Sequence, residues 1–146
     1  MSNSSLYDRD FYAWTSEQAA LLREGRLSDA DIANIAEEIE SMGRSEKREL
    51  VSRLTVLLLD LLKWQYQPGL RGASWRASIQ VQRISLETHL GDNPSLKAVM
   101  PDATAQAYRI ARIEAGKETG LATESFPALA PWDFDQMVNE DFWPGA

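Results

Sequence analysis

Residues 45–66 form the longest apolar stretch with helical spacing in this chain. Apolar side chains recur three or four residues apart along one side of the expected helix, at Leu50, Leu54, Leu57, Leu61 and Trp64. A helix that is apolar on most sides belongs inside a bundle or a membrane. Because the run 54–62 contains Asp60 and is much shorter than the roughly 20 apolar residues of a membrane span, the sequence predicts the central buried helix of a bundle.

Length and composition predict a single globular domain over residues 1–146. The chain has no cysteine, which excludes disulfides and thiolate metal sites. Its first ten residues lack the basic-then-apolar pattern of a signal peptide. We therefore expect a cytoplasmic protein that does not contact a membrane.

The net charge of −7 is distributed in blocks. Residues 1–43 carry 3 basic and 9 acidic side chains, residues 44–89 carry 8 and 4, and residues 90–146 carry 4 and 9. This alternation suggests that acidic outer segments pack onto a basic middle, although chance surface charge explains it equally well. The overall acidity disfavours nonspecific binding of nucleic acid or anionic membranes.

Helical patterns also cover most of the remaining chain, and no segment has a convincing strand pattern. A bent helix or two short helices joined near Trp14 are expected first, with Thr15 and Gln18 as a capping box and with Tyr7, Phe11, Tyr12 and Trp14 clamping this arm onto the core. The other expected helices cover residues 28–43, 74–90, 101–118 and 131–138.

The helix expected over residues 28–43 has a clear apolar side, which we predict to be buried. Its members are Ile32, Ile35, Ala36, Ile39 and Met42. Gly43 is predicted to follow the end of this helix, and Ser45 to cap the next one.

The last 25 residues, 122–146, contain three prolines and two tryptophans and have little helical pattern. We expect an extended strap, laid over a core of residues 7–121 by its aromatic side chains: Phe126, Trp132, Phe134, Phe142 and Trp143. Any of these aromatics left exposed would be the contact patch for a protein partner or for self-association.

Several long motifs resemble one known family. In chain order they are YDRDFYAW, GRLSDADIANIAEEIESMGRSEKREL, LLKWQYQP, SWRASI with Arg83, and NPSL, and together they extend from about Tyr7 to Leu121. They resemble the bacterial domain-of-unknown-function family number 29. The resemblance implies a small all-helical protein, of a kind frequent in cyanobacteria and some proteobacteria, and implies no activity. Many members have histidine before Leu-Leu-Lys, where this chain has Asp60, which weakens the case for acid–base or metal chemistry at that position.

The main enzymatic hypothesis is a carboxylate site. Its candidate catalytic residues are Glu38, Glu40, Asp60 and Lys63, and a metal ion, if there is one, would be bound by Glu37, Glu40 and Asp60. Such an ion could activate water for phosphoester hydrolysis. The alternative, which we favour, is a structural ion-pair network that joins these carboxylates to Lys63, Arg76 and Arg83, with Asp60 and Lys63 as one pair.

A second hypothesis is binding of single-stranded nucleic acid by basic and aromatic residues that alternate along the chain: Lys63, Trp64, Tyr66, Arg71, Trp75, Arg76 and Arg83. Among them, Trp75, Arg76 and Arg83 are the main candidate binding residues. Trp64 and Trp75 lie on apolar helix sides, so most of this set is expected in the core. His89, the only histidine, has no histidine or cysteine partner for a metal site or triad, and we expect no cofactor.

The sequence therefore predicts an all-α domain, an irregular bundle of five to seven helices with an aromatic tail. By elimination it favours a protein-binding or regulatory module over an enzyme. A metal-dependent phosphoester hydrolase and a single-strand-binding protein stay as alternatives.

Overall fold

A computed structural model of the protein describes residues 4–145, and its fold is all-α, as the sequence predicts. These residues form six α-helices and four short 3-10 helices, with no strand among them. By its contacts the chain divides into two compact units, Met1–Ser45 and Glu46–Ala146. The division falls within helix α3 (Ile32–Tyr66), and the single domain stays a prediction.

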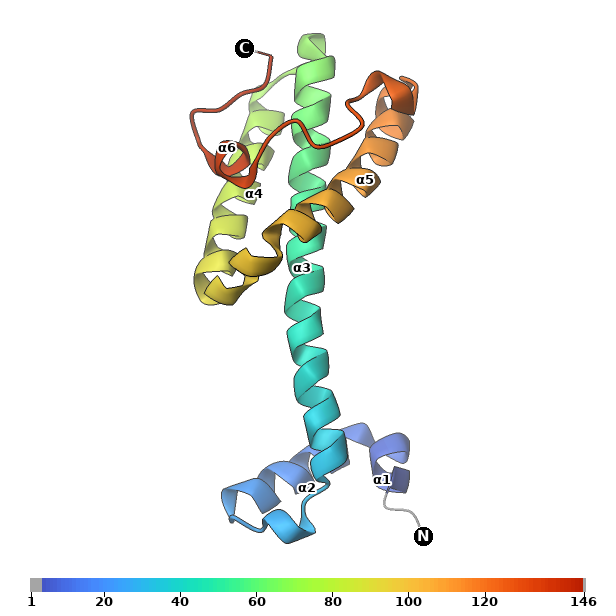
Figure 1. Ribbon diagram of the computed structural model, residues 1–146, viewed down its shortest axis with the longest axis vertical. Helices are drawn as coiled ribbons and strands as arrows, with labels where there is room; N and C mark the ends of the chain where they lie inside the picture. Colours follow the sequence, from blue (N-terminus) through green and yellow to red (C-terminus); the bar gives the residue numbers. More distant parts are fainter. Residues whose placement is uncertain (1–3, 146) are drawn as a thin grey trace. The chain divides into compact units, whose positions relative to one another are not determined.

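Two short α-helices and one 3-10 turn precede α3 in the first unit: α1 (Ser4–Arg9), α2 (Phe11–Arg23) and η1 (Leu27–Asp29) (Figure 1). α2 begins after Asp10, because the Asp10 carboxylate accepts a 3.1 Å hydrogen bond from the Ala13 N–H. The predicted break near Trp14, with Thr15 as a cap, is wrong, since both residues lie inside α2.

Trp14 organises the small core of the first unit. Its ring centroid lies 4.7 Å from that of Tyr7 and 5.5 Å from that of Phe11. Its indole Nε1 donates a 3.0 Å hydrogen bond to Asp31, whose own backbone N–H donates to the side chain of Gln18. Trp14 is the only buried hydrophobic residue among the described side chains of this unit.

One continuous helix, α3, replaces the two helices predicted over residues 28–43 and 45–66. Gly43 and Ser45 lie inside it, so the predicted helix end and helix cap are wrong. A glycine in a helix interior costs about 1 kcal/mol relative to alanine. Breaking the helix would instead leave up to four N–H and four C=O groups without helical partners, so the helix continues through Gly43.

The core of the second unit is built on α3 from Leu50 to Trp64. α4 (Ala73–Asp92) and α5 (Met100–Thr119) flank this part of α3 (Figure 1). The fully buried core side chains include leucines of α3, Ile79 and Leu86 of α4, and small residues of α5: Ala103, Ala107, Ala111 and Ala115. α5 ends at Gly120, whose φ of 77° gives the left-handed conformation common at helix ends.

The segment after α5, residues 121–145, which we call the tail, crosses the second unit and reaches α4 through the short helix α6 (Phe134–Val138) (Figure 1). Phe126, Trp132 and Met137 of this segment are buried in the core, while Phe134, Phe142 and Trp143 pack against it. None of these aromatic side chains is largely exposed, so the described residues do not form the patch of exposed aromatics that was expected to contact a partner.

Among the described helices, none combines the length and the apolar character that a membrane span requires.

Candidate functional site

Arginine and tryptophan side chains alternate at one end of the second unit. We call this group the arginine–tryptophan cluster; it consists of Trp64, Arg71, Arg76, Arg83 and Trp143. The Arg76 guanidinium lies 4.2 Å from the ring centroid of Trp143 and 5.2 Å from that of Trp64. Arg83 lies over Trp143 at 4.9 Å, and Arg71 over Trp64 at 5.1 Å. Each contact has the geometry of a cation–π interaction.

Arg83 is the most buried member of the cluster, with 2% of its surface exposed. Its Nε donates a 2.7 Å hydrogen bond to the carbonyl of Met137, and its Nη2 donates to the carbonyl of Phe142. Burial lowers the pKa of Arg83. The predicted carboxylate partners, Glu38, Glu40 and Asp60, are wrong, because Arg83 bonds to these carbonyl oxygens and lies over the ring of Trp143.

The cluster borders an open hollow of about 340 Å³, lined by Trp64, Arg71, Gly72, Arg76 and Trp143. Arg71 donates hydrogen bonds to the carbonyls of Trp64 and Pro144. The guanidinium groups therefore fasten the tail to α3 and α4 through carbonyl oxygens and aromatic rings. Of the predicted binding residues, Arg83 is buried in contacts with the tail, whereas Arg76 lies at the edge of the hollow.

Lys63 and Asp60 have separate partners, so the predicted pair between them is wrong. The Lys63 ammonium forms a 2.8 Å ion pair with Glu118 of α5 and lies 5.2 Å from the ring centroid of Trp75. The buried Asp60 accepts a 2.8 Å hydrogen bond from the amide of Gln82 on α4. Asp60 thus links two helices through a neutral partner, which satisfies a buried carboxylate without an ion pair.

The three candidate glutamates of α3 also have different surroundings. Glu37 forms a 2.8 Å ion pair with Arg44. Glu38 accepts a hydrogen bond from the Tyr7 hydroxyl, and this bond raises the pKa of Tyr7 to about 12. Glu40 is exposed. Among the described residues, Glu37, Glu40 and Asp60 do not form a group whose oxygens could share a metal ion.

Another group of side chains could share a metal ion. It consists of Glu46, Glu49 and His89, whose potential ligand atoms all lie within 4.8 Å of one another. His89 was not predicted as a metal ligand, because the sequence offers it no histidine or cysteine partner. The spacing of Glu46 and Glu49 places them on one side of a helix and was visible in the sequence. Their approach to His89, 40 residues further along the chain, depends on how α4 packs on α3.

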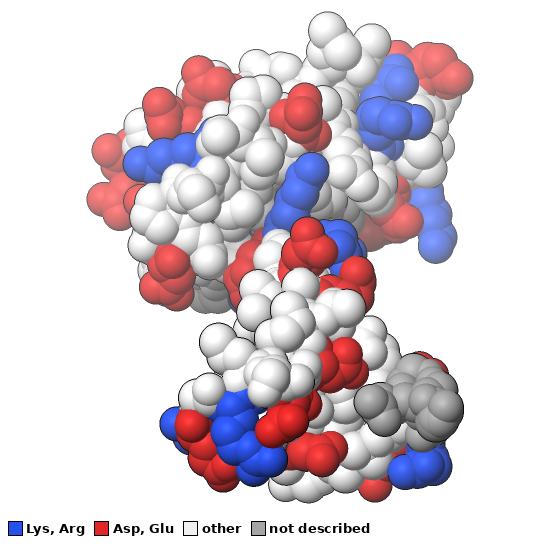
Figure 2. All heavy atoms as spheres, turned by 60° about the horizontal axis from the view of Figure 1, so that its bottom comes forward, with Lys and Arg blue, Asp and Glu red and all other residues white. Residues whose placement is uncertain are grey.

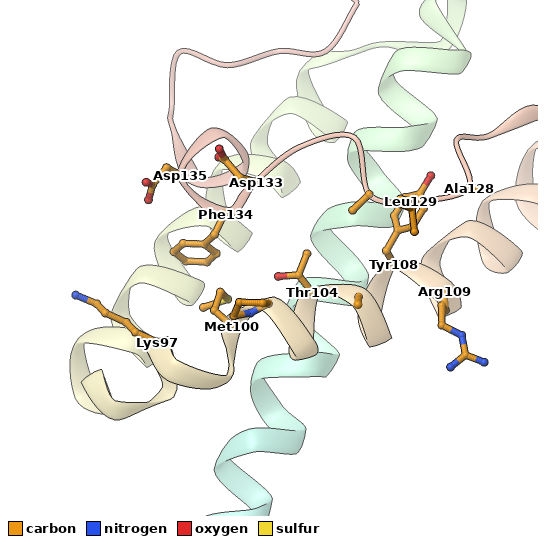
Figure 3. Close-up of a pocket in the computed structure, with 13 residues that line it drawn as sticks. Lys97, Met100, Thr104, Tyr108, Arg109, Ala128, Leu129, Asp133, Phe134 and Asp135 are labelled. Carbon is orange, nitrogen blue, oxygen red and sulfur yellow. The ribbon is translucent and has the colours of Figure 1, made fainter.

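A mostly apolar hollow of about 600 Å³ lies between α5 and the tail (Figure 3). In the close-up Phe134 and Met100 face one another across it, and Leu129 lies near Tyr108. Burial raises the pKa of Tyr108 to about 12, and its hydroxyl donates a 2.6 Å hydrogen bond to the carbonyl of Pro127. This bond holds the tail in place along one side of the hollow.

The first part of α3 carries apolar side chains that the sequence predicted to be buried, and here that prediction is wrong. Ile32, Ile39 and Met42 are 53%, 62% and 66% exposed. Together with the exposed small residues Ala36 and Gly43 they form one side of the helix, which we call the exposed stripe. α1 and α2 pack beside it instead, where Tyr7 and Trp14 bond to Glu38 and Asp31.

The unit that carries the exposed stripe is acidic. Residues 1–45 contain four basic and nine acidic side chains, a net charge of −5. Figure 2, which turns this end of the chain forward, shows acidic side chains beside a continuous uncharged surface.

The fold defines the chain as a small all-α protein, and its surfaces do not identify a reaction. A family model described as "Domain of unknown function DUF29" matches residues 6–143, nearly the whole chain. The chain therefore belongs to the DUF29 family, which confirms the resemblance found in its motifs. No curated protein and no solved structure matches the chain.

Proposed function

We propose that the protein is a protein-binding module and that the exposed stripe of α3 binds the apolar side of a basic amphipathic helix from a partner protein. The observation that carries the proposal is the exposure of Ile32, Ile39 and Met42, each more than half open to solvent. Their spacing is that of one helix side, which a partner helix can cover along its length.

The apolar surface gives a reason for association. Fully burying a side chain such as isoleucine or methionine contributes about 1.5–3 kcal/mol relative to leaving it exposed. Three such side chains, already partly covered, still offer several kcal/mol to a partner. This is one part of the free energy that binding needs, because association itself costs about 4–15 kcal/mol.

Ala36 and Gly43 support a helix as the occupant. Both are exposed and lie seven residues apart on the same side of α3. A side chain added at Gly43 would meet no atom within 4 Å, so nothing within the chain requires a glycine there. A residue without a side chain allows the backbone of a partner helix to approach closely.

The negative charge of the first unit favours a basic partner as the molecule that binds the exposed stripe, and disfavours a second copy of the chain there. Two copies paired through this surface would bring together two units of net charge −5. Like charges facing each other across an interface are unfavourable, whereas lysine and arginine flanking the partner's apolar side would be attracted.

Binding of single-stranded nucleic acid has weaker support. Trp64 and Arg83 are buried, and arginines or the tail occupy the ring faces of Trp64 and Trp143. Bases would have to displace these contacts to stack on the rings. The hydrolase alternative is weakened in the same way by the separate partners of Glu37 and Asp60.

The test uses a labelled helical peptide of about 18 residues, five turns, with leucine on one side and lysine elsewhere. Fluorescence anisotropy should report saturable binding to the full chain. Ile39→Asp should weaken this binding by about 10-fold or more, because it places a charge in the middle of the apolar contact. The matched control is Ile113→Asp, at an isoleucine of α5 that is also exposed, and it should leave binding unchanged.

A second peptide, with glutamate in place of lysine, separates the partner chemistries. We expect it to bind much more weakly than the lysine peptide. Equal binding of both peptides, or equal loss in Ile39→Asp and Ile113→Asp, would reject the proposed surface. Sedimentation that shows a dimer of the free chain, lost in Ile39→Asp, would assign the stripe to a second copy instead.

A further inference from the structure

Three side chains of two different chemical types converge between α3 and α4 in the second unit. Glu46 and Glu49 lie three residues apart on one side of α3, and His89 lies in the last turns of α4. His89 is buried, with 6% of its surface exposed, while the side chains of Glu46 and Glu49 are 46% and 44% exposed. A buried imidazole thus faces two carboxylates that solvent can reach.

One hydrogen bond fixes which nitrogen of His89 faces the carboxylates. His89 Nε2 lies 3.0 Å from the backbone carbonyl oxygen of Glu46. A carbonyl oxygen can only accept, so Nε2 must carry the proton of this bond. The other nitrogen, Nδ1, lies 3.4 Å from a carboxylate oxygen of Glu49 and 3.7 Å from one of Glu46. In the neutral imidazole, Nδ1 has a lone pair, and three electron-rich atoms then face one another.

A cation held among the three atoms would relieve the repulsion between them, in addition to Arg53, which already donates a hydrogen bond to the same oxygen of Glu49. This cation can be a proton on Nδ1 or a metal ion, and the distances favour the metal ion. A hydrogen bond from a protonated Nδ1 would bring nitrogen and oxygen to about 2.7–3.2 Å, closer than both separations. Two ligands of one tetrahedral zinc ion, each about 2.0–2.1 Å from it, lie about 3.3 Å apart. The observed separations of 3.4 and 3.7 Å lie nearer to this second value.

We propose that Glu46, Glu49 and His89 form a binding site for a divalent transition-metal ion, with Zn²⁺ as the best-matched ion. One imidazole nitrogen and two carboxylate oxygens are ligands that zinc accepts, and they leave at least one coordination position open to water. Mg²⁺ and Ca²⁺ prefer sites made only of oxygen and are expected to bind more weakly.

Other groups of the chain form hydrogen bonds to the three proposed ligands, as the residues around a bound metal ion do when they orient its ligands. The bond from Nε2 to the carbonyl of Glu46 orients the imidazole. The amide of Asn93 donates a 3.3 Å hydrogen bond to Glu46, and Arg53 donates a 2.8 Å hydrogen bond to Glu49. The hydrogen bond from Arg53 lowers the pKa of Glu49.

The experiment is calorimetric titration of ZnCl₂ into the full chain, purified without a histidine tag and stripped with a chelator. One saturable Zn²⁺ site per chain is expected. Glu49→Gln should weaken Zn²⁺ binding by at least about 10-fold, since loss of a ligand should exceed the 10–100-fold effect of losing an outer partner. Glu46→Gln should weaken it similarly, and Glu87→Gln, at an exposed glutamate of α4, is the matched control.

Replacement of the buried His89 could unfold the chain, so the two glutamate variants decide the outcome, with circular dichroism as the check on folding. A second readout is the visible absorption of Co²⁺, which should report nitrogen and oxygen ligands in the wild-type chain and disappear in Glu49→Gln. No saturable Zn²⁺ binding, or equal binding by Glu49→Gln, Glu46→Gln and Glu87→Gln, would overturn the site. These residues lie outside the exposed stripe, so the result is independent of the proposed partner.

Discussion

Arg83 stabilises its buried charge with carbonyl groups and an aromatic ring. Its guanidinium bonds to the carbonyl oxygens of Met137 and Phe142 and lies over Trp143. All three partners belong to the tail, whereas Arg83 belongs to α4. One side chain therefore joins the last segment of the described chain to the core.

We expect Arg83→Ala to lower the free energy of unfolding by about 2–4 kcal/mol, because hydrogen bonds to charged groups contribute about 1.5–3 kcal/mol each and a large buried side chain is lost with them. Urea denaturation followed by tryptophan fluorescence measures the change. Arg109→Ala, at an exposed arginine of α5, should change it by less than about 0.5 kcal/mol. If both substitutions lowered the free energy of unfolding equally, Arg83 would not be the residue that joins the tail to the core.

At the scale of residues, the sequence predicted which polar side chains the core must accommodate but not their partners. Arg83 and Asp60 were predicted to belong to a structural ion-pair network, and both are buried. Their partners, carbonyl oxygens of the tail and the amide of Gln82, carry no charge and so leave no charge pattern in the sequence. The group of Glu46, Glu49 and His89 was missed for a similar reason, since it depends on the packing of two helices.

At the scale of elements, α3 combines two different environments in one helix. From Leu50 onward its apolar side chains are buried, whereas Ile32, Ile39 and Met42 are exposed. Helical periodicity was visible in both parts of the sequence. Periodicity identifies an apolar side but does not say what covers it, and this is why the buried side predicted for residues 28–43 was wrong.

Because α3 continues through Gly43, we can predict whether an alanine at this position stabilises or destabilises the chain. Gly43→Ala should raise the free energy of unfolding by about 0.5–1 kcal/mol, because alanine is the better helix former and meets no atom within 4 Å. If Gly43 instead followed the end of a helix, as the sequence predicted, and had the left-handed conformation common at that position, alanine would destabilise the chain.

Gly120 provides the matched comparison, since its φ of 77° does place it in the left-handed region. Gly120→Ala should lower the free energy of unfolding by about 1–2 kcal/mol. Urea denaturation of both variants gives the two signs. A destabilising Gly43→Ala would contradict the continuous helix.

At the scale of the whole molecule, the two units differ in how much apolar surface they bury. The core of the second unit draws on α3, α4, α5 and the tail. The first unit buries Trp14 and leaves the apolar side of its longest helix open. An acidic unit with a small core and an exposed apolar helix side is suited to gain stability from a bound partner.

Methionine oxidation measures how accessible the exposed stripe is, because Met42 is 66% exposed while Met100 and Met137 are 8% and 0% exposed. Mass spectrometry after hydrogen peroxide treatment should find Met42 oxidised at least about 10-fold faster than the other two. A saturating amount of the lysine-rich helical peptide should slow the oxidation of Met42 and leave the rates of Met100 and Met137 unchanged. The proposed binding surface would be contradicted if Met42 of the free chain were oxidised as slowly as Met137. It would also be contradicted if the peptide did not change the oxidation rate of Met42.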